Sequence, residues 1–151
     1  MNFYVATGLE RADEAKTLAA ALAAMGHTQT YDWTAHGSVQ DEGPERIAEV
    51  AVEELRGVGK ADLFIALLPG GRGTHTEFGC ALALAMDDDD SVPANSVVAR
   101  KRLVVLVGPT EDASGRTCAF YLHPRVDERF ATVGELHSWL RGLRRSGVRY
   151  G

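Results

Sequence analysis

The chain has 151 residues, of which 45% are hydrophobic, and this is enough for one domain with a substantial core. Its formal net charge of -5 gives no electrostatic reason to expect a nucleic-acid polymer or an anionic membrane as a partner, so a small ligand is expected instead. Met1 leads directly into an apolar segment, without a signal peptide, and no run of about 18 apolar residues follows. We therefore expect one cytoplasmic domain over residues 1–151.

The chain alternates segments of strand and helix character. The expected strands are residues 2–6, 28–34, 63–68, 102–107 and 129–133, which are short and rich in β-branched, aromatic or continuous apolar residues. The expected helices are residues 11–27, 44–59, 74–86 and 133–147, which have helical apolar spacing or strong helix formers. Residues 35–44 are expected to be a loop, which either forms a flap over the strand ends or is an ordinary solvated connection.

Four consecutive aspartates, residues 87–90, suggest a metal site at first sight. No second cluster of ligands accompanies them and like charges repel each other, so residues 86–101 are expected to be a solvated loop. The two cysteines form neither a metal-ligand pattern nor a disulfide framework. We expect no metal and no other cofactor.

The order of these segments predicts an α/β fold. It is expected to be a doubly wound, flavodoxin-like or Rossmann-like parallel sheet of about five strands in the order 2-1-3-4-5. Ligands of such sheets bind at the carboxyl ends of the strands. Residues 4–8, 31–33 and 70–77 should therefore converge on one cleft.

Glu77 is the central candidate in that cleft. It follows a buried strand and a glycine-rich turn, and residues 74–77 also spell T-x-x-E, a capping box in which Thr74 and Glu77 satisfy the helix start. However, Glu77 shares its helical side with Cys80, Ala81 and Leu84, which places the carboxylate against the protein interior. A half-buried acid beside a glycine-rich cleft is a candidate reactive group.

Glu54 is a second acid on an apolar face. It lies seven residues after Ile47 and four after Val50, within the apolar stripe of the expected helix 44–59. Desolvation raises a carboxyl pKa and suits the group to donating a proton, although stripe edges also carry charged residues without a function.

Three segments carry a resemblance to a known family. At residues 3–9 (FYVATGL), 31–34 (YDWT) and 67–84 (LLPGGRGTHTEFGCALAL) the chain resembles the nucleoside 2-deoxyribosyltransferase superfamily, which includes nucleoside 5'-monophosphate N-glycosidases and is distantly similar to TIR domains. The resemblance covers about residues 1–130 of the chain.

The resemblance implies roles for individual residues. Glu77 matches the family's nucleophile, Tyr4 matches the tyrosine that supports it, and Glu54 stands where classical members have an acidic aspartate. A further family aspartate corresponds to Gly71 and is missing here, which is typical of relatives that cleave nucleotides rather than transfer free nucleosides.

The chemistry that this implies is cleavage or transfer at the N-glycosidic bond of a (deoxy)nucleoside or its 5'-monophosphate, through a covalent glycosyl-glutamate intermediate. The proton donor to the departing base is then either Glu54 or Asp32. Trp33 and Tyr31 either stack on the base or pack against the sheet. A 5'-phosphate would meet the amides of the glycine turn near Arg72. The expected substrate-binding residues are Thr7, Gly8, Arg11, Tyr31, Trp33, Gly71, Arg72, Gly73, Thr74, His75, Tyr121 and His123.

The resemblance also implies a homodimer or a higher homo-oligomer. In the family, a segment after the fourth strand crosses to the neighbouring cleft, and residues 117–124 (TCAFYLHP) match it here. Tyr121 and His123 of one chain would then approach Glu77 of the other. The alternative is that this segment folds back onto its own sheet edge.

Three other functions remain open at the level of sequence. A catalytically inactive nucleotide-binding module would keep the glycine turn and the aromatic residues, and a TIR-like NAD glycohydrolase would share the glutamate. A plain flavodoxin-like interaction domain would need neither the ligand-binding features nor the glutamate. The sequence identifies neither the base nor the sugar.

Overall fold

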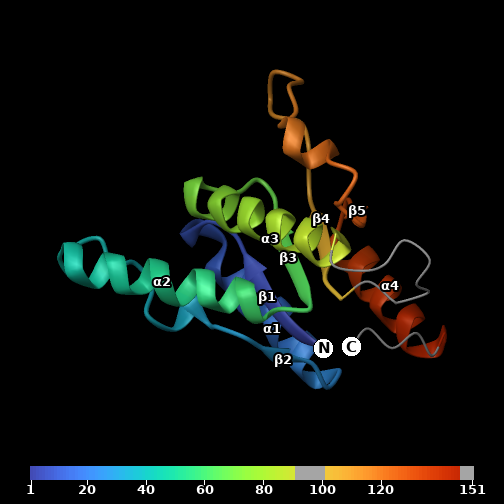
Figure 1. Cartoon of the computed structure of the whole chain (residues 1–151), viewed down its shortest axis with the longest axis horizontal. Coiled ribbons are helices and arrows are strands. Elements are labelled where there is room, and N and C mark those ends of the chain that lie inside the picture. Colours follow the sequence, from blue (N-terminus) through green and yellow to red (C-terminus); the bar gives the residue numbers. More distant parts are fainter. Residues whose placement is uncertain (91–100, 147–151) are drawn as a thin grey trace.

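A computed structural model describes residues 1–90 and 101–146, with side chains up to residue 142. Its five strands form one sheet in the order β2-β1-β3-β4-β5, and every neighbouring pair is parallel (Figure 1). The strands are β1 (Asn2–Ala6), β2 (Thr28–Gln29), β3 (Leu63–Leu67), β4 (Leu103–Val107) and β5 (Glu128–Phe130). The expected α/β class and strand order are confirmed.

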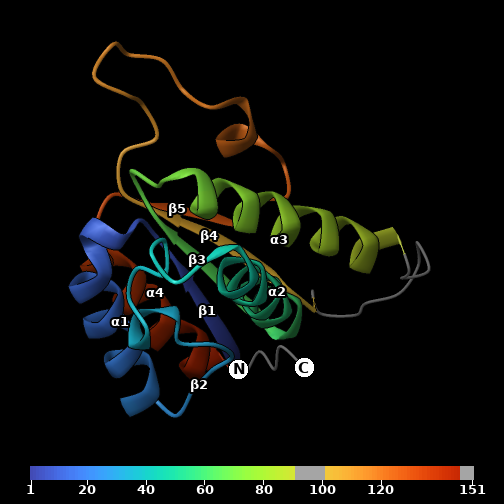
Figure 2. The same cartoon turned by 90° about the vertical axis from the view of Figure 1, so that its left-hand side faces the viewer.

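Helices cover both faces of this sheet. The helices are α1 (Ala12–Ala24), α2 (Pro44–Lys60), α3 (Arg72–Asp90) and α4 (Val133–Ser146). Figure 2 shows α2 and α3 together on one face, with α1 and α4 on the other. Within the described ranges, no helix combines the length and the apolar character that crossing a membrane requires.

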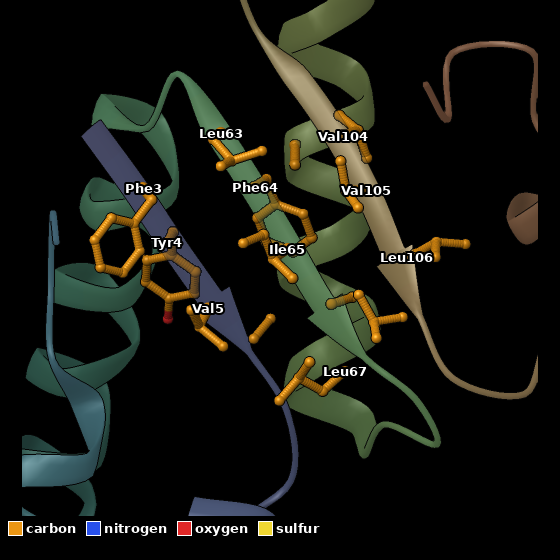
Figure 3. Packing of buried hydrophobic residues seen from close by; sticks show 14 of the residues in the cluster. Phe3, Tyr4, Val5, Leu63, Phe64, Ile65, Leu67, Val104, Val105 and Leu106 are labelled. Atoms are coloured by element: carbon orange, nitrogen blue, oxygen red, sulfur yellow. The ribbon is translucent and has the colours of Figure 1, made fainter. Parts of the chain in front are cut away.

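The central strands hold the core. All five residues of β3 and all five of β4 are buried, as expected for parallel strands that are covered on both faces. Tyr4 of β1 stacks on Phe64 of β3 with ring centroids 6.0 Å apart, and the two residues are register partners (Figure 3). This packing holds the Tyr4 ring in the core.

The second strand is shorter than residues 28–34, so that expectation was wrong at its carboxyl end. β2 ends at Gln29, and residues 33–35 form a 3₁₀ turn, η2. The carboxylate of Asp32 caps this turn by accepting from Thr34 N, 3.1 Å away, and the Trp33 indole donates to Val5 O over 2.8 Å. These contacts hold the chain in a turn instead of a continued strand.

The aspartate run is not a solvated loop over residues 87–90, because α3 continues to Asp90. Asp88 lies 3.4 Å from the buried Arg102, and Asp89 lies 2.6 Å from the buried Arg125. These cations offset the repulsion between neighbouring carboxylates and so permit the helix to extend. The rest of the expected loop, residues 91–100, lies outside the described residues.

Candidate active site

A cavity of about 390 Å³ lies at the carboxyl ends of β1 and β3. Its volume falls in the range of about 300–1,000 Å³ that is usual for small-molecule sites. Its wall is formed by residues 7–10, Trp33, residues 36–40, Ile47, Val50, Ala51, Glu54, Gly71, Gly73, Thr74 and Glu77. The three segments that the sequence directed toward one cleft therefore each reach this cavity.

Glu77 and Tyr4 form the buried centre of the site. Glu77 is 6% exposed on the first turns of α3, and its Oε1 accepts a hydrogen bond from the Tyr4 hydroxyl. The helix begins at Arg72, and no hydrogen bond joins Glu77 to Thr74 in the part of the chain that the structure describes. The carboxylate is thus engaged by the core tyrosine and does not act as the second half of a capping box.

Burial controls the ionisation of this pair. The pKa of Glu77 is raised to about 7, chiefly by burial; the Tyr4 hydrogen bond opposes this by stabilising the carboxylate, and the nearby charge of Glu54 adds to the rise. The pKa of Tyr4 is itself raised, first by burial and then by the charge of Glu77, so the phenol keeps its proton and remains a donor. Glu77 can therefore be an anion near neutral pH while lying almost out of contact with water.

Glu54 is a second acid in the same cavity, on α2. Burial raises its pKa, and His36 opposes that shift. Among residues 1–90 and 101–146, the Glu54 carboxyl has no hydrogen-bond or ion-pair partner, so it lacks the direct donor that Tyr4 provides to Glu77. One cavity therefore holds two carboxyl groups in different surroundings, one with a hydrogen-bond donor beside it and one without.

The turn before α3 forms another side of the cavity. Gly71, Gly73 and Thr74 line it, and Thr74 is 3% exposed with no hydrogen-bond partner for its Oγ1 among the described residues. A Cβ on Gly70 would lie 2.5 Å from the Thr74 side chain, which explains the need for glycine beside it. Amides at a helix N-terminus attract anions, and an unpartnered hydroxyl adds a donor to that end of the cavity.

Thr7, Gly8 and Trp33 also line the cavity as anticipated. Thr7 Oγ1 donates to Leu67 O over 3.1 Å and so joins the ends of β1 and β3. Trp33 is 5% exposed and packs in the core while part of it borders the cavity, so the packing interpretation accounts for most of its surface.

Some of the expected site residues lie outside the cavity wall and bond to other parts of the chain. Tyr31 donates its hydroxyl to Glu53 at 2.9 Å, and Asp32 is occupied as the cap of η2. Arg11 donates to Leu68 O and pairs with Glu14. Of the two candidate proton donors, Glu54 lines the cavity with Glu77 and Asp32 does not; Glu10 is a further acid of the cavity wall.

The remaining expected residues lie beside the site rather than in its wall. Arg72 is exposed at the start of α3. His75 bonds Gly71 O and the Tyr121 hydroxyl, each at 2.7 Å, and stacks on the Tyr121 ring. His123 Nδ1 accepts from Arg125 N at 3.1 Å. Within one chain, these side chains do not reach the cavity.

Residues 36–40 form one wall of the cavity. The sequence predicted a loop here, either as a flap over the strand ends or as a solvated connection. The available signal was Val39, an apolar residue within a polar segment, and it is 6% exposed. His36 had no sequence signal. No group of three His, Cys, Asp or Glu side chains in the described ranges is arranged to hold a metal ion.

No family model matches the chain, and no curated protein matches it either. Among solved structures, the chain is similar to the CMP N-glycosidase BcmB of Clostridium botulinum. The TM-score is 0.55 at 17% identity, over 97% of this chain and 99% of that chain. This likeness shows a shared fold across nearly the whole of both proteins.

The ionisation of Glu77 should appear as a pH-dependent cost to stability. Its folded pKa of about 7 lies above the ordinary value of 4.5, so folded protein binds the proton more tightly, and stability falls as pH rises through that window. Glu77→Gln removes this cost. The unfolding free energy of Glu77→Gln minus that of wild type is measured by urea denaturation at each pH. We expect this difference to increase by about 3 kcal/mol, in favour of the variant, from pH 4.5 to pH 8.

Glu45→Gln, at an exposed position of α2, is the control for removing a carboxyl elsewhere. A difference between Glu77→Gln and wild type that does not change with pH would show that Glu77 titrates as an ordinary surface acid.

Proposed function

We propose that the protein cleaves or transfers at the N-glycosidic bond of a (deoxy)nucleoside 5'-monophosphate, as a member of the nucleoside 2-deoxyribosyltransferase superfamily. The observation that carries this proposal is the buried Glu77 carboxylate, held by Tyr4 and sharing one cavity with Glu54. The shared fold with a solved structure described as a CMP N-glycosidase supports the same class of reaction.

In the proposed reaction, a carboxylate oxygen of Glu77 forms a bond to C1' of the sugar as the C1'–N bond breaks. The electron pair of that bond leaves with the base, and Glu54 gives a proton to the base. Water, or the hydroxyl or nitrogen of an acceptor, then attacks C1' and releases Glu77. Burial favours the protonated form of Glu54, and the Tyr4 hydrogen bond favours the anion of Glu77 against the larger effect of its own burial.

The first test is base release, measured by chromatography with a panel of nucleosides and 5'-monophosphates. We expect Glu77→Gln to abolish release, because the amide keeps the shape but is not an anionic nucleophile. Glu54→Gln should slow reluctant leaving bases far more than activated ones, because a general acid matters most when the base departs poorly. Glu45→Gln is the control on an exposed face of α2.

Other outcomes of that test favour other functions. Binding of nucleotides without turnover by wild type would indicate an inactive nucleotide-binding module. Release of nicotinamide from NAD, with no release from the monophosphates, would favour a TIR-like NAD glycohydrolase. Full activity of Glu77→Gln would remove the proposed nucleophile.

The preference for a 5'-phosphate is supported by the end of the cavity at the α3 N-terminus. A phosphate there would face the amides near Gly73 and the unpartnered Thr74 hydroxyl. A tenfold preference requires only about 1.4 kcal/mol, which one charge-assisted hydrogen bond can supply.

We expect Thr74→Val to reduce the ratio of kcat/KM for a monophosphate over its nucleoside by about tenfold, because the hydroxyl is lost while the shape is kept. Thr74→Ser retains the hydroxyl and is the matched control. Arg72→Ala separately measures the contribution of the exposed guanidinium. Equal kcat/KM for nucleoside and monophosphate in wild type would contradict the proposed preference.

We also propose that two subunits complete each site. The connection between β4 and β5 projects away from the sheet and carries the 3₁₀ turn η3 (Ala119–Leu122), as Figure 2 shows. Phe120 is 63% exposed and Leu122 is 62% exposed. Adjacent exposed apolar side chains on a projecting segment support an interface with a second copy of the chain.

A complementation experiment tests this arrangement. Glu77→Gln chains and His123→Ala chains should each be inactive alone, and co-refolding should recover activity because a mixed dimer has one intact site. Co-refolding each variant with itself is the control. No recovery in the mixture, or a monomeric mass by sedimentation at working concentration, contradicts a shared site.

A further inference from the structure

The glycine turn at the α3 end of the cavity receives little support from packing. A Cβ on Gly71 or on Gly73 would meet no atom within 4 Å among the described residues outside the neighbouring backbone. Glycine also has the greatest backbone freedom of any residue, and a mobile turn loses that freedom when a ligand binds. A side chain that fixes this turn in advance would therefore raise the affinity for a ligand that the turn contacts.

His75 fixes the turn through the carbonyl oxygen of Gly71. That oxygen accepts from the backbone amide of His75 over 3.2 Å and lies 2.7 Å from Nδ1 of the His75 ring. A carbonyl oxygen only accepts hydrogen bonds, so Nδ1 carries the hydrogen. In a trans peptide the N–H points opposite to the C=O, so these contacts direct the Arg72 amide out of the N-terminus of α3. The 5'-phosphate is proposed to bind at that end of the cavity.

Tyr121 selects the nitrogen of His75 that carries the hydrogen. Nε2 of His75 lies 2.7 Å from the Tyr121 hydroxyl, and in the neutral ring with a hydrogen on Nδ1 it accepts from that hydroxyl. The two rings also stack, with centroids 5.7 Å apart. The hydroxyl of Tyr121 therefore stabilises the tautomer of His75 that donates to Gly71.

Tyr121 makes this contact from a well-supported position in the β4–β5 connection. It is 7% exposed, and its ring lies 5.8 Å from the ring of the buried Phe78, measured between centroids. Its carbonyl oxygen accepts from Nε of Arg129, in β5, over 2.7 Å. The side chain of Tyr121 thus joins the β4–β5 connection to the first turn of α3.

We propose that Tyr121, His75 and the Gly71 carbonyl form a hydrogen-bond network that holds the α3 amides in the orientation that binds the 5'-phosphate. His75 and Tyr121 are positioning residues, because neither lines the cavity that holds Glu77 and both act through Gly71, which does. This inference rests on the proposed function, since it names the residues that support its preference for a monophosphate.

A direct contact between His75 and the phosphate is the alternative role for this side chain. The two roles predict opposite results for Tyr121→Phe. If His75 donated to the phosphate from Nε2, removal of the Tyr121 hydroxyl would free that nitrogen, and phosphate binding would be unchanged or tighter. If His75 acts through Gly71, the same change removes the partner that fixes its tautomer, and phosphate binding becomes weaker.

The first measurement is the Kd of 2-deoxyribose 5-phosphate, determined by calorimetry. This probe has no glycosidic bond, so it binds wild type without turnover. We expect the Kd to rise about tenfold in His75→Phe, which keeps an aromatic ring but loses both hydrogen bonds of the side chain. Tyr121→Phe should raise it about threefold, and the double variant should raise it no further than His75→Phe, because the residues act in one network.

Two further variants separate the two bonds of His75. His75→Asn places an amide N–H near the position of Nδ1 and keeps a donor to Gly71, whereas His75→Gln places its amide near the position of Nε2 and loses that donor. We expect the Kd of His75→Asn to stay within about threefold of wild type, and that of His75→Gln to resemble His75→Phe. The opposite order would assign His75 a direct contact through Nε2 and would overturn the network.

The tautomer of His75 gives a readout that does not depend on activity. Long-range ¹H–¹⁵N spectra of the histidine rings should show hydrogen on Nδ1 of His75 in wild type, with the signal assigned by its loss in His75→Phe. Hydrogen on Nε2 in the neutral ring of wild type would contradict the network. Ser138→Ala is the matched control, because it removes a side-chain bond to the carbonyl four residues earlier, Gly134 O at 3.0 Å, on α4. It should change neither the Kd nor the His75 signal.

Kinetics distinguish a positioning role from a general loss of structure. His75→Phe and Tyr121→Phe should lower kcat/KM for a monophosphate through a higher KM, with little change in kcat and none in kcat/KM for the nucleoside. Equal losses on both substrates would indicate damage to the fold and would overturn the proposed role. Tyr121→Phe removes a single oxygen atom, so it tests the proposal even if His75→Phe does not fold.

The proposal and the proposed function can fail separately. An unchanged Kd in His75→Phe and Tyr121→Phe removes the network, even if base release is confirmed. Failure of wild type to bind the sugar phosphate removes it as well. If wild type releases no base from any substrate but its Kd responds to the variants as expected, the proposed reaction fails and the network stands as part of a phosphate-binding site.

Discussion

The contact between Tyr4 and Glu77 is the interaction on which the rest of the site depends. It joins the middle of β1 to the first turns of α3, and it exists because β1 and β3 are neighbours in the sheet and α3 follows β3. A carboxylate this far from water is costly unless a donor faces it. The stack of Tyr4 on Phe64 supplies that donor from a fixed position in the core. The sheet therefore sets the surroundings of the acid.

The two cavity acids differ because their surroundings differ. Glu77 is almost completely buried but receives a hydrogen bond that favours its anion, whereas Glu54 is only half-buried and receives none within the described residues. This difference in surroundings is the physical basis for the different chemical roles that we propose for the two glutamates. The glycine turn before α3 adds a third kind of surface, rich in donors, and so gives the cavity one end suited to an anion.

Much of this architecture could be predicted from local sequence patterns, and the features that were predicted wrongly or missed share one cause. The burial of Glu77 followed from Cys80, Ala81 and Leu84 on its helical side, and the strand order followed from the alternation of segments. The end of β2 was missed because a cap and an indole hydrogen bond to β1 override strand propensity. The helix over the aspartates depends on arginines far along the chain, and the position of His36 in the wall depends on tertiary packing. Contacts between distant residues are not visible in a local pattern.

The central claim is that Glu77 attacks the sugar, and trapping the intermediate tests it most directly. A 2'-fluorine destabilises the oxocarbenium-like transition states and so slows hydrolysis of the covalent glycosyl-enzyme, and wild-type protein incubated with a 2'-fluoro nucleoside 5'-monophosphate should gain the mass of one fluorosugar phosphate. Peptide mapping should place that mass on Glu77, and Glu77→Gln should gain none. An adduct on another residue, or base release at an undiminished rate by Glu77→Gln, would contradict the account.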